Sequence, residues 1–446
     1  AWNDCLHNVQ ARTCVDRNAC PSPQGKPEES RVCAMPAPSP PVQPGPEKII
    51  VTLGQEEVVF DWSEDICPTK GLPDVQARAI RNYQNLIIMP SIQAVPPSAA
   101  KNTILYGPDF NNLHHRCTVS LQSLNKRDIT DFNHQQWIAS AYSEDGKTVH
   151  AFVHNEYHDP QSSPPCKKDD TQPSNPCWYN FLAYAVSTDG GYSFIEPSAP
   201  DNLLAILPFK WDPYAIPTIK ERASYRPPQP HGYMGPSNVI KAKDGYYYIM
   251  VLAFNSPTNP ESGTCIMRTK NLNDPQSWKF WDGQGFNIPF MNPYETDIPD
   301  PDPYICAFVS KETIASMGGS LTYNTYLEKY MLVSVEIFDH NNNPTTCGFW
   351  FSLSDDLIHW EKPQLIKTTA LGFPPCDSST VKMYDKDDNL ISQEAYASLI
   401  DHDAPDVSFT QADDTAYLYF MRNIGTQADN FLNRDLIRVP ITFKKV

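Results

Sequence analysis

A repeated grouping of short strands is the feature that most limits what this chain can fold into. In each group a strand, a tight turn and a second strand precede a third strand, a polar turn and an aromatic residue. Clear examples cover 135–158 with 178–194, 235–254 with 264–281, and 320–338 with 348–362. The groups recur at intervals of roughly 50 to 95 residues, which is typical of propeller blades.

Other features of the sequence favour the same fold class. The 43 prolines among 446 residues argue against long helices. An opening group before residue 117 and a closing group at 380–446 complete the series. We therefore predict an all-β fold, a five-bladed β-propeller, with a large β-sandwich of similar hairpins as the alternative.

The cysteines indicate the compartment. There are twelve, an even number spread along the whole chain, and no two are spaced as Cys-x-x-Cys. Zinc-ribbon and thioredoxin-like sites therefore have no support, and disulfides in an oxidising environment are the better interpretation. We expect a secreted, extracellular or periplasmic protein rather than a cytosolic chain with reduced buried thiols.

Charge and hydropathy limit the classes of partner that this chain can bind. The chain has 52 Asp and Glu against 35 Lys and Arg, a net charge of −17. Nucleic acid and anionic membranes require a positive patch, and the sequence contains no basic run. Nor does any stretch reach about 18 consecutive apolar residues, so we predict no membrane span. Neutral sugars or cationic ligands fit this composition better.

Three regions follow one another along the chain. Residues 1–33 hold four cysteines and too few aliphatic residues for a core without cross-links, which predicts a small disulfide-rich N-terminal module. Residues 34–47 are a proline-rich linker that favours extended polyproline II. Residues 48–446 carry the strand groups and form the predicted propeller.

The polar turns after the third strands carry the most specific signal. The segment 187–194, STDGGYSF, matches the sialidase Asp-box pattern, in which the Asp side chain bonds turn amides and the aromatic residue seals the blade edge. Asp356 with Trp360, and Asn271 with Trp278, stand in similar turns. These motifs report the fold and say little about catalysis.

Residues 48–446 resemble the five-bladed superfamily that includes family 43 glycoside hydrolases. The match rests on these turns and on Gly235-Pro236-Ser237-Asn238 ahead of 244–248, DGYYY. The resemblance implies a carbohydrate-active enzyme whose catalytic acid would fall near Met234. A methionine cannot donate a proton, so an acid in this chain must come from another position.

Residues 1–33 resemble a thrombospondin type 1 repeat, through Trp2-x-x-Cys5, QARTC at 10–14 and PEESRVC at 27–33. The resemblance implies that Trp2 stacks with Arg12 and Arg31 in place of a core. It also implies a role in adhesion, with a partner in the extracellular matrix or on a cell surface.

Candidate site residues were sought among carboxylates near blade ends, because glycosidic hydrolysis ordinarily needs two carboxyl groups. The densest cluster is His154, Glu156 and His158, which alternation sends to one side of a strand that begins near Val149. Glu156 is the expected catalytic acid or base, and His154 and His158 are expected to bind substrate. A hydrogen-bonded network at the blade edge is the alternative interpretation.

Asp74 opens the first strand group, where the resembled glycosidases carry their catalytic base. Arg78 or Arg81 could bind a carboxylate-bearing sugar or keep Asp74 ionised by charge pairing. The last group contributes Asp403 as a third catalytic candidate and His402 as a substrate contact. Further candidates for substrate binding are Asn238 and Glu336.

The leading functional hypothesis is a glycoside hydrolase acting on an extracellular polysaccharide through paired carboxylates. A non-catalytic propeller that binds a glycan or a protein is the second hypothesis, and a histidine-based metal site is the third. The predicted hydrolase requires no metal or other cofactor, although a structural calcium ion is compatible with it.

Overall fold

The computed structural model divides the chain into two compact units, 1–47 and 48–446. It describes residues 9–11, 30–32, 48–68, 71–94, 101–126, 128–158, 178–210, 231–254, 262–315, 317–338, 346–371, 393–424 and 432–446. The first unit contributes two short antiparallel strands, β1 (Val9–Ala11) and β2 (Ser30–Val32). The rest of the expected cysteine module, with Trp2, Arg12 and the side chain of Arg31, and the proline-rich linker lie outside the described residues.

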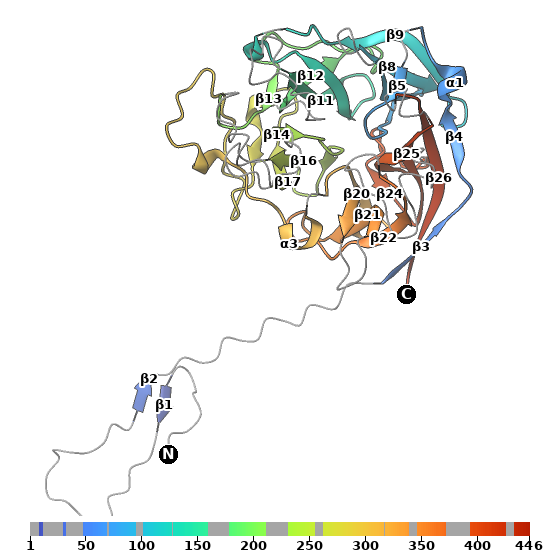
Figure 1. Cartoon of the computed structure of the whole chain (residues 1–446). Helices are drawn as coiled ribbons and strands as arrows, with labels where there is room; N and C mark the ends of the chain where they lie inside the picture. The colour runs from blue at the N-terminus through green and yellow to red at the C-terminus, as the bar shows by residue number, and fades with distance from the viewer. Residues whose placement is uncertain are drawn as a thin grey trace, which may run out of the picture. The chain divides into compact units, whose positions relative to one another are not determined.

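The second unit is built almost wholly of strands, which form four sheets in its described part (Figure 1). The first sheet has β5 (Gly71–Pro73), β6 (Ile80–Arg81), β7 (Ile87–Ala94), β8 (Lys101–Gly107) and β9 (His114–Gln122). The second has β10 (Gln135–Tyr142), β11 (Val149–His158), β12 (Trp178–Ser187), β13 (Leu203–Ala205), β14 (His231–Met234), β15 (Ile240–Lys241), β16 (Tyr247–Phe254), β17 (Ser262–Thr269) and β18 (Lys279–Phe280).

The remaining two sheets come from the C-terminal half and the start of the unit. One has β19 (Ser320–Asn324), β20 (Lys329–Phe338), β21 (Thr346–Ser354), β22 (Gln364–Thr368) and β24 (Gln411–Ala412). The other has β23 (Glu394–Ile400), β25 (Thr415–Asn423), β26 (Arg434–Lys445), β3 (Ile49–Leu53) and β4 (Glu57–Phe60). Helical structure in the described residues is limited to α1 (Trp62–Asp65), α3 (Lys311–Ile314) and the 3-10 turns Ile129–Asp131, Pro275–Ser277 and Asp302–Tyr304.

The sheets lie around a common centre, in a propeller-like arrangement (Figure 1). Arg78, between β5 and β6, donates to the carbonyl of Gly319 at 2.7 Å and to that of Pro236 at 3.5 Å. Ser320 in β19 accepts a hydrogen bond of 3.0 Å from the main chain of Leu399 in β23. These hydrogen bonds join the four sheets through segments in or beside β5, β14, β19 and β23.

Apolar side chains fill the space between neighbouring sheets. Phe349 of β21 packs against Phe420 of β25 with ring centroids 5.2 Å apart, and Phe351 lies 5.7 Å from Phe443 of β26. These rings are buried, and burial of aromatic surface is a main source of stability between stacked sheets.

The sheet that contains β26 is assembled from both ends of the second unit. β26 pairs antiparallel with β25 on one side and with β3 and β4 on the other. Its register with β3 runs from Ile441 opposite Leu53 to Lys445 opposite Ile49. The start and the end of this unit therefore lie in one sheet.

The polar turns singled out in the sequence close by side-chain hydrogen bonds. Asp189 Oδ1 accepts from the main-chain amides of Tyr192 and Ser193, both at 3.0 Å, and Phe194 is buried. Asp356 Oδ1 accepts from the amides of Ile358 and His359 at 2.9 and 2.8 Å, ahead of the buried Trp360. A short acidic side chain and a buried aromatic residue thus fix both turns.

Disulfides join Cys67 to Cys117 and Cys265 to Cys306. Cys347 is also disulfide-bonded. The predicted use of cysteines as cross-links is confirmed for these residues. In the described part of the chain, no helix has the length and apolar character needed to cross a membrane.

Candidate active site

Asp74 is the centre of a group of side chains that come from three different sheets. It directly follows β5, in the break between β5 and β6. Its Oδ2 accepts from Trp137 Nε1 of β10 at 3.0 Å, and its Oδ1 accepts from the Tyr396 hydroxyl of β23 at 3.3 Å. Arg434, the first residue of β26, makes an ion pair and a hydrogen bond with the same Oδ1. Three donors therefore surround this carboxylate.

Glu156 and His154 form a second part of the group, on β11. His154 Nε2 lies 3.0 Å from Glu156 Oε1, so these side chains share one side of the strand, as the alternation predicts. The ring of His154 also lies 5.7 Å from that of Trp137, which binds Asp74. Two of the three carboxyl groups predicted from the sequence to be catalytic thus lie in one cluster, and only 14% of the Asp74 side chain and 16% of the Glu156 side chain are exposed.

Tyr396 is a further buried partner of Asp74. Burial raises the pKa of its phenol well above the usual value, and the charges of Asp74 and Glu156 raise it further. Its φ of 58° lies in the left-handed region, at the register shift between Ala395 and Ser398 in the β23–β25 pair. A non-glycine residue in this conformation is uncommon and marks a position that the surrounding structure fixes. The β-bulge thus aims a neutral hydroxyl at Asp74.

Arg434 supplies the positive charge of the cluster. Burial alone would lower the pKa of its guanidinium, but Asp74 and Tyr396 outweigh burial and raise that pKa. The cation offsets the charge of Asp74 within a site that is largely shielded from water.

The arrangement has the parts that acid–base chemistry on a neutral substrate requires. One carboxylate is held by an arginine, a tryptophan and a tyrosine, and a second lies beside a histidine. Two carboxyl groups in one partly shielded site can divide the roles of proton donor and of base or nucleophile.

Arg78 and Arg81 are not part of this cluster. Arg78 is buried, and its guanidinium donates to main-chain carbonyls, including those of Ala77, Pro236 and Gly319. Burial lowers its pKa to about 9. Arg81 lies over the ring of Phe409. An ion pair with Asp74 is one of the two roles that the sequence suggests for Arg78 or Arg81; Asp74 pairs instead with Arg434, because β26 approaches β5 at this point.

His402 and Asp403 also lie outside the cluster. The imidazole of His402 is stacked between Phe110 and Tyr417, with centroid distances of 4.0 and 3.8 Å, and its Nε2 lies 2.9 Å from the Tyr419 hydroxyl. Burial lowers its pKa to about 3, so it is a neutral ring of the core. Asp403 is exposed, and its main-chain amide donates to Asp401.

The structure describes the side chains of two of the three remaining residues that were predicted to contact substrate, and both are buried. Asn238 is buried and its Oδ1 accepts from the main-chain amide of Leu321 at 3.2 Å, which joins two sheets. Glu336 is buried in β20, where its carbonyl accepts from Trp350 Nε1. The side chain of His158 lies outside the described residues.

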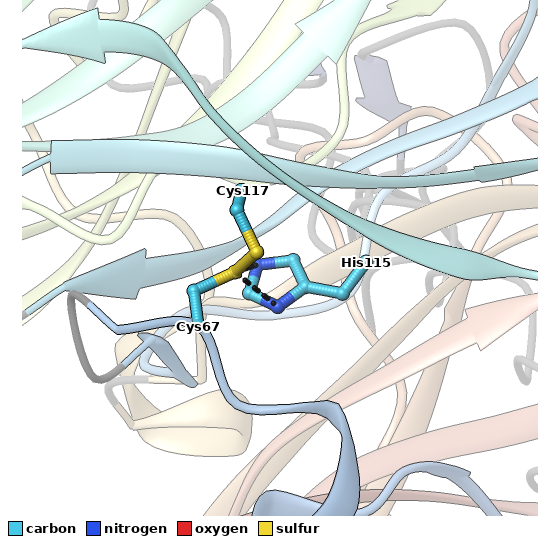
Figure 2. Close-up of side chains that lie close together, drawn as sticks. All are labelled: Cys67, His115 and Cys117. Atoms are coloured by element: carbon cyan, nitrogen blue, oxygen red, sulfur yellow. Dashed lines mark hydrogen bonds between the residues drawn. A yellow bond between two sulfur atoms is a disulfide. The ribbon is translucent and has the colours of Figure 1, made fainter.

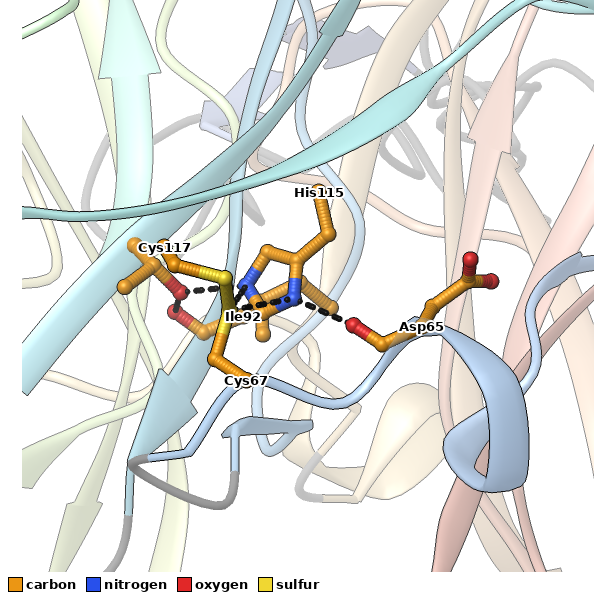
Figure 3. The surroundings of a disulfide bond; sticks show 6 residues. Asp65, Cys67, Ile92, His115 and Cys117 are labelled. Carbon is orange, nitrogen blue, oxygen red and sulfur yellow. Dashed lines mark hydrogen bonds between the residues drawn. A yellow bond between two sulfur atoms is a disulfide. The ribbon is translucent and has the colours of Figure 1, made fainter.

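One group of His, Cys, Asp or Glu side chains in the described residues is close enough to share a metal ion: Cys67, His115 and Cys117. Figure 2 shows the imidazole beside the disulfide, with Nδ1 3.2 Å from the sulfur of Cys67. Because the two sulfurs are bonded to each other, they are not thiolate ligands. Figure 3 shows the same nitrogen facing the carbonyl of Asp65 at 2.8 Å. In this form the group stabilises the first sheet and binds no metal through sulfur.

Sequence reasoning missed Trp137, Tyr396 and Arg434. Trp137 stands within a strand group that was recognised, and an indole near the start of a first strand was a usable signal. Tyr396 and Arg434 carry no local motif, and Arg434 lies 360 positions from its partner Asp74.

No protein-family model matches this sequence, and no curated protein matches it either. Among solved structures, a GH43_1 enzyme from Xanthomonas citri in complex with xylotriose is 10% identical, with 87% of this chain and 90% of that chain covered and a TM-score of 0.41. An alpha-L-arabinofuranosidase from Podospora anserina is 10% identical, with 87% and 97% covered and a TM-score of 0.41. A Trypanosoma rangeli sialidase is 11% identical, with 86% and 59% covered and a TM-score of 0.41. At this level the similarity assigns no role to any residue of this chain.

Proposed function

We propose that this chain is a glycoside hydrolase that acts on an extracellular polysaccharide through Asp74 and Glu156. The observation that carries the proposal is that Asp74 and Glu156, from different sheets, meet at Trp137: its Nε1 donates to Asp74, and its ring lies 5.7 Å from that of His154, which contacts Glu156. Both were candidates because of their positions in the strand groups, and neither is explained as part of a turn or a core.

The proposed fold is a five-bladed β-propeller. The nine-stranded sheet contains one parallel pair, β12 with β14, and a division at that pair gives two blades. Each of the other three sheets supplies one more blade, which gives five blades in all. The turn of Asp189 then takes the place of a sialidase-type Asp-box at a blade edge.

The two carboxylates receive different roles in this proposal. Asp74 faces only donors in its described hydrogen bonds, which suits an anion that acts as base or nucleophile. Glu156 lies beside His154, which can exchange a proton with it, and this suits the proton donor. Met234 is buried in β14 and takes no part in proton transfer.

The test is release of reducing ends from a panel of neutral and acidic polysaccharides. We expect Asp74→Asn and Glu156→Gln each to lower kcat at least about a hundredfold, the scale of a lost general acid or base. Asp300→Asn, at an exposed loop, is the matched control, and Asp403→Asn tests the third carboxylate of the sequence analysis. Activity retained in both Asp74→Asn and Glu156→Gln would reject the assignment.

The second candidate is a propeller that binds glycans without cleaving them. The presence of Met234 where resembled glycosidases carry an acid favours it. In that case wild type and both carboxylate variants release no sugar, while Trp137→Ala weakens binding to an immobilised polysaccharide.

The last part of the proposal concerns the compartment, the partners and the cofactors of the protein. We propose secretion, because cross-linked cysteines suit an oxidising compartment. The N-terminal module would attach the enzyme to an extracellular matrix or cell-surface partner. The proposed chemistry requires no cofactor, and a structural calcium ion is compatible with it.

A further inference from the structure

A cavity of about 460 Å³ lies between the end of β9 and the segment that follows β12. Its lining includes Leu124, Asn133, Glu196 and Asn202, and no residue of the Asp74 cluster. The volume is within the range of small-molecule sites, which is about 300 to 1,000 Å³. We call this cavity the Glu196 pocket.

Glu196 is a partly buried carboxyl group whose described partners are all neutral. It accepts hydrogen bonds from the side-chain amides of Gln136 and Asn133, both buried. In the part of the chain that the structure describes, no Lys, Arg or His pairs with it. Burial raises its pKa to about 7, although the two amides act in the opposite direction. An ionised carboxylate without a cation is costly in such a place.

The other uncompensated polar atoms around Glu196 are also acceptors. Asn202 lines the pocket with only 2% of the residue exposed, and its Oδ1 has no partner among the described residues. Gln136, which donates to Glu196 but does not line the pocket, also has a buried Oε1 atom without a partner among the described residues. A ligand that satisfied this site would therefore bring hydrogen-bond donors and positive charge.

Exposed aliphatic side chains form part of the pocket lining. Leu124 is 59% exposed and Ile195 is 71% exposed, which is unusual for large aliphatic side chains. Lys126 and Asp131, the other charged residues that line it, lie 3.9 Å apart and face solvent. The pocket thus combines polar groups around Glu196 with exposed hydrocarbon from Leu124 and Ile195 and an exposed Lys126–Asp131 pair.

We propose that the Glu196 pocket binds the primary ammonium group of a small organic ligand. The ammonium supplies three donors and the single positive charge that Glu196 lacks, and the carbon skeleton lies against Leu124 and Ile195. Calcium suits the pocket less well, because it takes six to eight oxygen ligands. A neutral sugar would leave the carboxylate charge uncompensated. The overall charge of −17 also favours a cation.

The ligand class can be tested with a matched pair of sugars. Glucosamine and N-acetylglucosamine share a ring, but only the first carries an ammonium. In calorimetric titrations of the full chain at pH 7 and physiological salt, we expect glucosamine to bind at least about tenfold more tightly. Cadaverine is a diamine without a sugar ring. Binding of both amines would indicate a site for aliphatic amines in general, and binding of glucosamine alone would indicate a site for amino sugars. The ligand binds through its ammonium in either case.

The residue is tested by Glu196→Gln, which keeps the size and the hydrogen-bonding capacity of the side chain. We expect an affinity loss of at least about tenfold for either amine. Glu312→Gln, an exposed position in α3, removes the same charge elsewhere and should bind as wild type does. If Glu196→Gln does not fold, as judged by its circular dichroism spectrum, the comparison of the two sugars on wild type decides.

The pH dependence is a third readout. Cadaverine remains charged up to about pH 10, like lysine. Its affinity should therefore rise about tenfold or more from pH 5.5 to pH 8 as Glu196 ionises, and this rise should vanish in Glu196→Gln. Lys126 and Asp131 are the other titratable residues facing the pocket, so Asp131→Asn should keep the rise.

The proposal is overturned if both sugars bind equally, if Glu196→Gln retains full affinity, or if calcium binds in place of the amines. Asp74→Asn should bind amines normally, which separates this site from the proposed hydrolysis.

Discussion

Removal of Arg434 tests whether the Asp74 cluster is held together by its one strong ion pair. Only 16% of the Arg434 side chain and 14% of the Asp74 side chain are exposed, so Arg434→Met leaves a mostly buried carboxylate without its cation. Loss of one partner of a buried pair costs about 3 to 5 kcal/mol. Asp74 keeps its bonds from Trp137 and Tyr396, so we expect the lower end, about 3 kcal/mol.

The measurement is urea-induced unfolding followed by tryptophan fluorescence, with Arg434→Met, Asp74→Asn and the double variant as a cycle. We expect a coupling energy of about 2 kcal/mol, because each single change strands the other group. Lys241→Met breaks the pair with Glu144, whose side chains are 45% and 51% exposed, and should cost less than about 1 kcal/mol. A cost below about 1 kcal/mol for Arg434→Met, or additive single changes, would refute the reasoning.

Three further variants probe other parts of the fold. Cys117→Ser opens the 50-residue loop closed with Cys67 and should lower the free energy of unfolding by about 4 kcal/mol on the chain-entropy model; a loss under about 1 kcal/mol would contradict this. The pKa of His402 is about 3 in the folded chain and 6.5 in the unfolded chain, so the folded chain holds this ring neutral. The free energy of unfolding should therefore fall as the pH drops from 6.5 toward 3, with a loss of about 2.7 kcal/mol at pH 4.5. His402→Gln should flatten that slope in acid titrations, and an unchanged slope would exclude His402 as its source. Gly232→Ala would place a Cβ 1.8 Å from a main-chain oxygen of β12 and should lower the free energy of unfolding by at least about 2 kcal/mol. Gly245→Ala, where the space is open, should lower it much less, and equal melting temperatures of the two variants would count against this reasoning.

Local patterns were enough to predict much of the fold and half of the site. The alternation along β11 predicted that Glu156 and His154 share one side, and their contact of 3.0 Å confirms it. The position of Asp74 at the start of the first strand group was likewise readable, because it depends on the order of strands in one sheet.

The partners of Asp74 could not be predicted in the same way. Arg434 and Tyr396 reach it only because the last strands of the chain close the sheet beside the first ones, and no local spacing records that pairing. Two nearer arginines, Arg78 and Arg81, offered a more obvious but different ion pair. His402 was misleading for a related reason: a histidine between aspartates suggests chemistry, whereas two aromatic rings from separate elements bury it.

The pairing of β26 with β3 has a consequence for biosynthesis. The ribosome synthesises β3 long before β26, and among the described strands β26 is its partner, so β3 stays unpaired until β26 has been made. Because Arg434 is the first residue of that late strand, the cation of the candidate active site arrives in the same step that completes this sheet. A nascent chain that stops short of β26 would therefore expose an unpaired strand edge and lack the ion pair at Asp74, so maturation of the site and protection from aggregation are completed together.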